Sequence, residues 1–148
     1  MFGCVCADPR DTLQLGKMIE STGVSAVAVH ARHVEDRPRH CASSDGVRIL
    51  SEALSIPVIY NGDVFSHSDI ARLRGVSGAA SVMIARGAMW NPSIFRSAAQ
   101  GGFAPLYEVA QRFVTLAEQY RLHWSDVKYT LQQLFKDCLL YTSDAADE

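Results

Sequence analysis

The sequence alternates three times between a helix-like segment and a short strand-like segment, and no other feature limits the possible folds as strongly. Each helix-like segment has apolar residues three and four positions apart, and each strand-like segment is a short apolar run. The successive pairs are residues 8–23 with 24–30, 45–54 with 56–63, and 66–75 with 79–87. Short apolar runs directly behind helix stops are typical of buried parallel strands. The alternation therefore predicts an α/β protein built on a parallel sheet.

Caps and apolar spacing predict where these helices begin and which faces they bury. Asp8 or Asp11 can cap the first helix, and Gly23 can end it. Ser66 or Ser68 can cap the third helix. The residues expected to face the core are Leu15, Met18 and Ile19 in the first helix and Val47, Leu50 and Leu54 in the second.

The pattern changes after Pro92, and the second half of the chain is predicted to be helical. A break rich in glycine and proline is followed by two amphipathic segments. Their apolar stripes are Leu106, Val109, Phe113, Leu116 and Tyr120 in one, and Val127, Leu131, Leu134, Phe135 and Cys138 in the other. We therefore expect an α/β part over residues 1–98 and an all-α part over 99–140. The acidic residues 141–148 continue neither pattern, and we expect a disordered or non-native tail there.

Charge and cysteine content exclude some classes of protein. The net charge of the 148 residues is −2, so no global basic field indicates nucleic-acid binding. No signal peptide is evident, and no apolar run approaches the roughly 18 residues needed to span a membrane. The four cysteines fit neither a redox nor a zinc motif and are Cys4, Cys6, Cys41 and Cys138. We expect a cytoplasmic protein with reduced thiols and no metal site.

Each predicted strand ends in polar residues next to a small one. The three ends are residues 30–32 (His-Ala-Arg), 61–63 (Asn-Gly-Asp) and 85–87 (Ala-Arg-Gly). Ligands of α/β proteins bind at the carboxyl ends of the strands. Arginine followed by glycine at the start of a short helix suits a phosphate, because backbone N–H groups and the guanidinium can both donate to it.

Taken one at a time, these residues also have simpler interpretations. Arg86 alone could be a solvated arginine, residues 61–63 a tight turn, and His30 a structural histidine. Only the recurrence at three successive strand ends favours a ligand site. The loop of residues 30–40 carries three arginines, including Arg32 and Arg37, and could be a basic lip that contacts a phosphate-rich polymer or simply a solvated loop.

Three stretches resemble the second half of a tRNA-dihydrouridine synthase, in order and spacing. They are "VSAVAVHARHVEDRP", "IPVIYNGDV" and "VMIARGAMWNPSIF". The Met-Trp-Asn-Pro run of the third is the most specific, whereas Asn-Gly-Asp occurs in other flavin barrels. The likeness extends from about Asp11 to Leu139 and is greatest to the eukaryotic branch that acts at position 20 of the tRNA D-loop.

The resemblance implies a fold, a reaction and a set of site residues. The family has a (β/α)8 TIM barrel that holds FMN, followed by a helical tRNA-binding domain. It reduces uridine to 5,6-dihydrouridine with hydride from NADPH. The chain would supply the last barrel strands and helices over residues 1–98 and the start of the helical tRNA-binding domain over residues 99–140. The implied partner is tRNA, with no membrane and a monomeric complete protein. The implied cofactor contacts are His30, Asn61, Gly62, Asp63, Ala85 and Arg86, and the implied tRNA contacts are Arg32 and Arg37.

Two departures from the family bear on activity. The family's catalytic cysteine follows the fourth strand in an Asn-x-Gly-Cys-Pro context, and none of the four cysteines here has that context, so no catalytic residue is assigned. A flavin-contacting lysine of the fifth strand is missing where this chain reads "MFGCVCAD". Three βα units cannot close an eight-stranded barrel, and we expect no activity from the chain alone.

Two other functions stay open at this point. One is a different FMN- or phosphate-binding TIM-barrel enzyme, against which the Met-Trp-Asn-Pro run argues. The other is a non-catalytic RNA-binding module, which the net charge of −2 disfavours.

Overall fold

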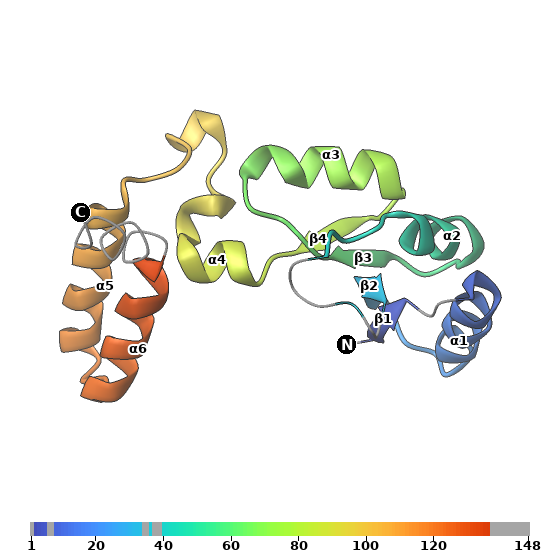
Figure 1. Cartoon of the computed structure of the whole chain (residues 1–148), viewed down its shortest axis with the longest axis horizontal. Coiled ribbons are helices and arrows are strands. Elements are labelled where there is room, and N and C mark those ends of the chain that lie inside the picture. The colour runs from blue at the N-terminus through green and yellow to red at the C-terminus, as the bar shows by residue number, and fades with distance from the viewer. Residues whose placement is uncertain (1, 6–7, 34–35, 37–39, 137–148) are drawn as a thin grey trace, which may run out of the picture. The chain divides into compact units, whose positions relative to one another are not determined.

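The computed structural model describes residues 2–5, 8–33, 36 and 40–136 of the chain (Figure 1). The chain divides into two compact units, Met1–Ala85 and Arg86–Glu148. The first unit holds a parallel sheet with helices, and the second is helical. The mixed α/β structure with a parallel sheet agrees with the predicted fold class.

The sheet has four parallel strands rather than the three predicted. They are β1 (Phe2–Val5), β2 (Val27–His33), β3 (Val58–Asn61) and β4 (Ser81–Met83), in the order β1-β2-β3-β4. The extra strand is β1, which pairs with β2 through Phe2↔Val29 and Cys4↔His30. The helix–strand cycle does not reveal it, because it is short and no helix stop precedes it, although the family resemblance aligned this stretch with the fifth barrel strand.

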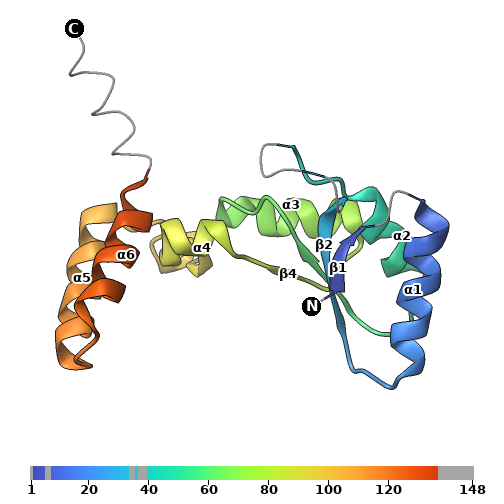
Figure 2. The same ribbon diagram turned by 60° about the horizontal axis from the view of Figure 1, so that its bottom comes forward.

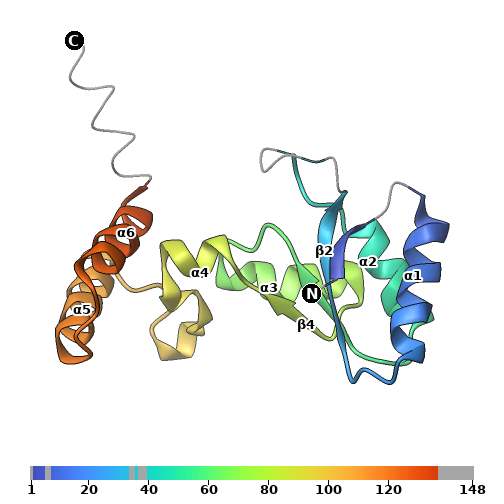
Figure 3. The same cartoon turned by 90° about the horizontal axis from the view of Figure 1, so that it is seen from below.

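Three helices connect the strands and lie along one side of the sheet (Figures 2 and 3). They are α1 (Pro9–Ser21), α2 (Asp45–Ala53) and α3 (His67–Ser77). Neighbouring strands are consecutive in the chain, and crossovers between parallel strands are right-handed in nearly all proteins. Every crossover helix is therefore placed on the same face, and α2 contacts both α1 and α3.

The core of this unit lies between the sheet and its helices. Alternate strand residues face it, and they are Val27, Val29, Ala31, Val58 and Tyr60. Helix α2 adds Val47, Leu50 and Leu54, as predicted, and α3 adds Leu73. Because side chains alternate along a strand, the intervening residues point to the opposite face of the sheet.

Helix α1 buries a different face from the one predicted. Ile19 packs against the core as expected, but Leu15 is 39% and Met18 58% exposed. The buried residues of α1 are Thr12 and Gly16. A Cβ at Gly16 would lie 2.5 Å from Leu50 Cδ2, so α1 approaches α2 through its smallest residue. Close approach of the two helices, rather than apolar spacing, decides which face of α1 turns inward.

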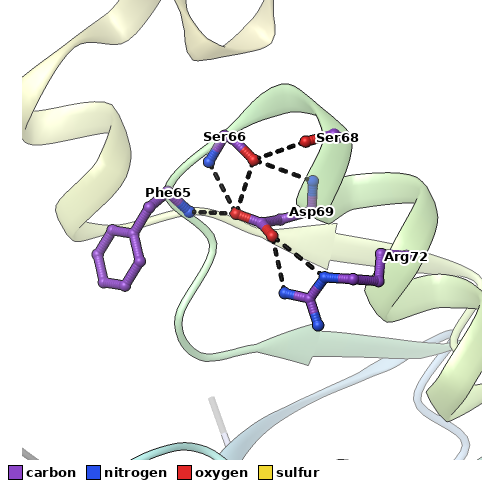
Figure 4. Close-up of polar contacts among 5 residues, drawn as sticks. All are labelled: Phe65, Ser66, Ser68, Asp69 and Arg72. Carbon is purple, nitrogen blue, oxygen red and sulfur yellow. Dashed lines mark hydrogen bonds and ion pairs between the residues drawn. The ribbon is translucent and has the colours of Figure 1, made fainter.

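Ser66, one of the two predicted caps, begins helix α3, and it does so in a capping box with Asp69 (Figure 4). The Ser66 hydroxyl accepts from the Asp69 N–H at 3.2 Å, and the Asp69 carboxylate accepts from the Ser66 N–H at 2.9 Å. Asp69 also accepts from the Phe65 N–H at 3.1 Å and from Arg72 at 2.7 Å.

At helix α1, Asp8 rather than Asp11 is the cap, and its side chain accepts from the Arg10 N–H.

The second unit contains only helices among its described residues. They are α4 (Arg86–Trp90), the 3₁₀ helices η1 (Pro92–Phe95) and η2 (Ala98–Gln100), α5 (Leu106–Gln119) and α6 (Trp124–Leu134). The unit begins at Arg86, and its first helix α4 contacts η1 and α6. Cys138 and the predicted tail 141–148 lie outside the described residues.

The predicted stripes of α5 and α6 are only partly buried. Leu134 is buried, but Leu116 is 39% and Tyr120 69% exposed. The buried residues of α5 are two alanines, Ala110 and Ala117, which let its backbone come close to its neighbours. Of the helices that the structure describes, none combines the length and apolarity required to cross a membrane.

Candidate cofactor-binding edge of the sheet

One row of residues crosses the sheet on the face opposite the helices. His30 of β2 is level with Asn61 of β3, and Asn61 is level with Met83 of β4. His30 is half-buried and Asn61 is buried. The prediction placed His30 at the end of its strand, but β2 continues to His33, whose partner on β1 is Val5. Pairing with β1 thus extends β2 beyond the apolar run from which its end was predicted.

Hydrogen bonds orient both polar side chains of this row. The Asn61 carboxamide nitrogen donates to the Met83 carbonyl at 2.9 Å, across to β4. His30 Nδ1 accepts from the Arg32 N–H at 3.3 Å. A neutral imidazole that accepts at Nδ1 carries its proton on Nε2. The Nδ1 contact therefore ties the orientation of the His30 ring to its own strand.

The chain leaves β3 through two residues with positive φ. Gly62 has φ 141° and Asp63 has φ 46°. A Cβ at Gly62 would lie 3.0 Å from the Ala42 Cβ and 3.5 Å from the Ala31 Cβ. Glycine is required here both by the backbone conformation and by the close approach of the β2–α2 connection.

Arg32 and Asp63 form an ion pair at this edge. The Arg32 side chain is 8% exposed and that of Asp63 25%. Arg32 Nε also donates to the His40 carbonyl at 2.7 Å, and the other Asp63 oxygen accepts from the Ala42 N–H at 2.8 Å. The structure thus brings together one residue predicted to touch tRNA and one predicted to touch the cofactor, and it pairs them with each other.

The other predicted site residues are Ala85, Arg86 and Arg37. Ala85 is exposed and ends the first unit, and Arg86 is half-buried and begins the second as the first residue of α4. The phosphate role of this pair stays a prediction. Arg37 lies outside the described residues.

Asn91 is a residue whose importance the motif analysis did not assign. Its Oδ1 accepts from the Ser93 N–H at 3.0 Å and from the Ser93 hydroxyl at 2.6 Å. Its carboxamide nitrogen donates to the Ala104 carbonyl at 3.0 Å, just before α5. In the Met-Trp-Asn-Pro run, Asn91 therefore caps η1 and ties it to the chain that leads into α5. An Asn followed by Pro at the first helical position is the sequence signal for such a cap.

The helical unit also has a groove of about 970 Å³ between its helices. Its apolar lining comes from α4, α5 and α6 and includes Met89, Val109, Phe113, Leu116 and Leu134. Arg96, Glu108 and Arg112 add charges of both signs. The groove is therefore mainly an apolar surface. Within the described ranges, no three His, Cys, Asp or Glu side chains gather into a possible metal site.

Comparison with known proteins places this geometry in a family. The human protein named tRNA-dihydrouridine(20a/20b) synthase (NAD(P)+)-like is 30% identical over 129 residues, which are 86% of this chain and 40% of that protein. The tRNA-dihydrouridine synthase B of Pasteurella multocida is 34% identical over 89 residues, 60% of this chain and 27% of that protein. A yeast protein named tRNA-dihydrouridine(20a/20b) synthase (NAD(P)+) is 34% identical over 88 residues, 57% of this chain and 24% of its own length.

The chain thus spans well under half the length of each of these relatives. The eukaryotic relatives are named for positions 20a and 20b, whereas the sequence resemblance pointed to position 20. The family described as "Dihydrouridine synthase (Dus)" matches residues 6–147, nearly the whole chain. This match includes all three strand ends, and it shows that the chain belongs to the dihydrouridine synthase family.

Proposed function

We propose that the chain acts in the reduction of uridine to 5,6-dihydrouridine in tRNA, with FMN as the bound cofactor and NADPH as the hydride source. Membership of the dihydrouridine synthase family carries this proposal. The relatives' names add support, since they specify tRNA and, in the eukaryotic cases, NAD(P)+.

The sheet is proposed to be part of a (β/α)8 barrel. Consecutive parallel strands with every connecting helix on one side are the arrangement from which such barrels are built. In a barrel the helix-free face is the interior, and the carboxyl ends of the strands carry the active site. The row that contains His30 and Asn61 lies on that face, near those ends.

The residues at this edge fit FMN in their chemistry. His30 contributes an imidazole and Asn61 a carboxamide. The family resemblance adds Arg86, whose guanidinium suits a phosphate. Asp63 does not oppose a phosphate, because its negative charge is balanced by Arg32. When bound, FMN would supply the redox chemistry that links NADPH to the uracil ring. The chain's own contribution would be to hold and orient the cofactor.

The RNA substrate is proposed to contact the basic loop that includes Arg37 and the helical unit. The proposal leaves three candidate positions for the modified uridine of tRNA, which are 20, 20a and 20b. Reduction of the 5,6 double bond also requires a proton donor. None of the chain's cysteines has the family's catalytic context, and we therefore expect no turnover by the chain alone.

The test joins the upstream part of the human relative to this chain and measures flavin and product. We compare the unsubstituted chimera with Arg86→Ala, Arg86→Lys and, as a control, Arg74→Ala, which removes an exposed arginine of α3. Hydrogen bonds to charged groups are worth about 1.5–3 kcal/mol. Arg86→Ala should therefore weaken FMN by roughly tenfold to several hundredfold. Arg86→Lys should fall between, because lysine keeps the charge but not the bidentate geometry.

Flavin absorbance, titration of the apoprotein and far-UV circular dichroism provide the readouts. Mass spectrometry of the tRNA then shows which uridine has gained two hydrogen atoms. A chimera that folds but retains no flavin would contradict the proposed function. A chimera in which Arg86→Ala binds FMN as tightly as the unsubstituted protein would place the phosphate elsewhere.

A further inference from the structure

Two charged side chains connect three separate backbone segments at the edge of the sheet. Arg32 of β2 pairs with Asp63, which follows β3, and donates from Nε to the His40 carbonyl at 2.7 Å. Asp63 in turn accepts from the Ala42 N–H at 2.8 Å. The end of β2, the exit from β3 and the segment before α2 therefore share one set of bonds.

Burial argues against a direct contact between Arg32 and RNA. Its side chain is 8% exposed, and its guanidinium is engaged by a carboxylate and a carbonyl. Binding to a nucleic-acid phosphate would require these partners to be given up. A buried charge that loses its partner is strongly unfavourable, so the observed pairing resists such an exchange.

The backbone at the β3 exit needs support from its surroundings. Asp63 has φ 46°, a left-handed conformation that is uncommon for residues other than glycine. Such conformations persist where neighbouring structure holds them in place. Both Asp63 carboxylate oxygens are bonded, one to Arg32 and one to the Ala42 N–H. Ala42 also lies against Gly62, where an added Cβ would approach within 3.0 Å.

We infer that Arg32 is a positioning residue that acts through Asp63. It fixes the β3 exit and the segment of residues 40–42 relative to each other. In this way it shapes the edge at which FMN is proposed to bind, without contacting the cofactor or the RNA itself. The expected effect on flavin binding rests on the proposed function. The coupling between Arg32 and Ala42 does not, because it can be measured without any ligand.

The first measurement is amide hydrogen exchange in the full chain. We compare Arg32→Gln, Asp63→Asn and the double variant with Arg72→Gln, which breaks another Arg–Asp pair of the same unit. Loss of a hydrogen bond to a charged group should raise the exchange rate of the Ala42 amide about tenfold or more in each single variant. The Ala42 amide should exchange about as fast in the double variant as in either single variant, because the two substitutions remove the same interaction. Arg72→Gln should leave the Ala42 amide unchanged.

The second measurement is FMN titration of the chimera described above, which carries the same substitutions and, in addition, Arg32→Lys. A residue that only stabilises the fold would not change the affinity of molecules that remain folded by circular dichroism. A positioning residue should lower FMN affinity about tenfold in Arg32→Gln, with partial recovery in Arg32→Lys and no change in Arg72→Gln. If Arg32 contacted a tRNA phosphate, its removal would also reduce the slope of the logarithm of the tRNA binding constant against the logarithm of the salt concentration by about one. We expect that slope to be unchanged in Arg32→Gln.

The outcomes separate this inference from the proposed function. Unchanged Ala42 exchange, or a reduced salt slope, in Arg32→Gln would overturn the positioning role. Unchanged FMN affinity in folded Arg32→Gln would overturn it as well. If the unsubstituted chimera takes up no FMN while Ala42 responds as expected, the coupling stands and the proposed cofactor is what fails.

Discussion

Among single residues, Asp69 makes the densest set of local bonds that the structure describes (Figure 4). Burial raises the pKa of its carboxyl, but hydrogen bonds from Arg72, the Phe65 N–H and Ser66 outweigh this and lower the pKa to about 2. The carboxylate also lies in the first turn of α3, where a negative charge is favourable. Asp69 therefore contributes to stability as an anion.

The pKa of Asp69 predicts an acid-dependent stability. Because the pKa is lower in the folded chain than its ordinary value of 3.8, the stabilisation is fully present above about pH 5 and is lost as the pH falls through the folded pKa of about 2. Because Arg72 is exposed and solvent screens its charge, the whole contribution is at most about 2 kcal/mol. Urea unfolding of Asp69→Asn should show a lower stability at pH 7 and a smaller loss between pH 4 and 2 than the unsubstituted chain. Asp45→Asn, at an exposed position, serves as the control. Parallel pH curves for Asp69→Asn and the unsubstituted chain would contradict this account.

Residue-scale features differ in how far the sequence could predict them. The cap at Ser66 involves neighbours in the chain, so the local pattern was sufficient. The pairing of Arg32 with Asp63 joins residues 31 positions apart and depends on the register of β2 and β3. Both residues were recognised as candidate site residues from their places at strand ends. Their mutual contact could not be predicted, because it requires the three-dimensional course of the segment between them.

At the scale of elements, close approach between helices explains the faces that were predicted wrongly. The apolar spacing of α1 favoured Leu15 and Met18 as core residues, yet Gly16 is the residue that meets Leu50. Helix α2 was predicted correctly because its large apolar residues themselves fill the core. Apolar periodicity identifies a buried face when large side chains fill the space, and it misses a face chosen for its small residues.

Two helical glycines give opposite predictions for the same substitution. Alanine is favoured over glycine in a helix by up to about 1 kcal/mol. At Gly75 of α3 nothing lies within 4 Å of an added Cβ, so Gly75→Ala should stabilise the chain by about 0.5–1 kcal/mol. At Gly16 the new methyl would meet the buried Leu50 side chain at 2.5 Å, and overpacking of this kind costs about 1–3 kcal/mol. Thermal unfolding should therefore shift upwards for Gly75→Ala and downwards for Gly16→Ala. Stabilisation by both substitutions would show that α1 and α2 are not closely packed.

At the scale of the whole molecule, the chain is organised as two compact units joined at Ala85 and Arg86. The sequence pattern puts the change from α/β to helical structure near residue 98, after the strand-like pattern and the Met-Trp-Asn-Pro run. Contacts of α4 with η1 and α6, which local patterns do not reveal, assign that run to the helical unit.

This division predicts that the two units respond separately to core substitutions. Both tryptophans, Trp90 and Trp124, belong to the helical unit, so their fluorescence reports its unfolding. Leu50→Ala should destabilise the sheet unit by about 2–5 kcal/mol, and Leu134→Ala the helical unit. In urea, Leu134→Ala should move the fluorescence transition, and Leu50→Ala should move only part of the circular dichroism transition. A single transition shifted equally by both substitutions would mean that the chain unfolds as one cooperative whole.

The row from His30 through Asn61 to Met83 has a consequence for how the length of this chain can change during evolution. Successive residues of a strand face opposite sides, so one inserted or deleted residue within β3 would exchange its two faces. Tyr60, which is 1% exposed in the core, would turn to the helix-free side, and Asn61 would turn into the apolar layer. Insertions and deletions within the strands would thus remove the polar row and the core together. Homologous chains should therefore differ in length at the connections between elements and keep the strands free of gaps.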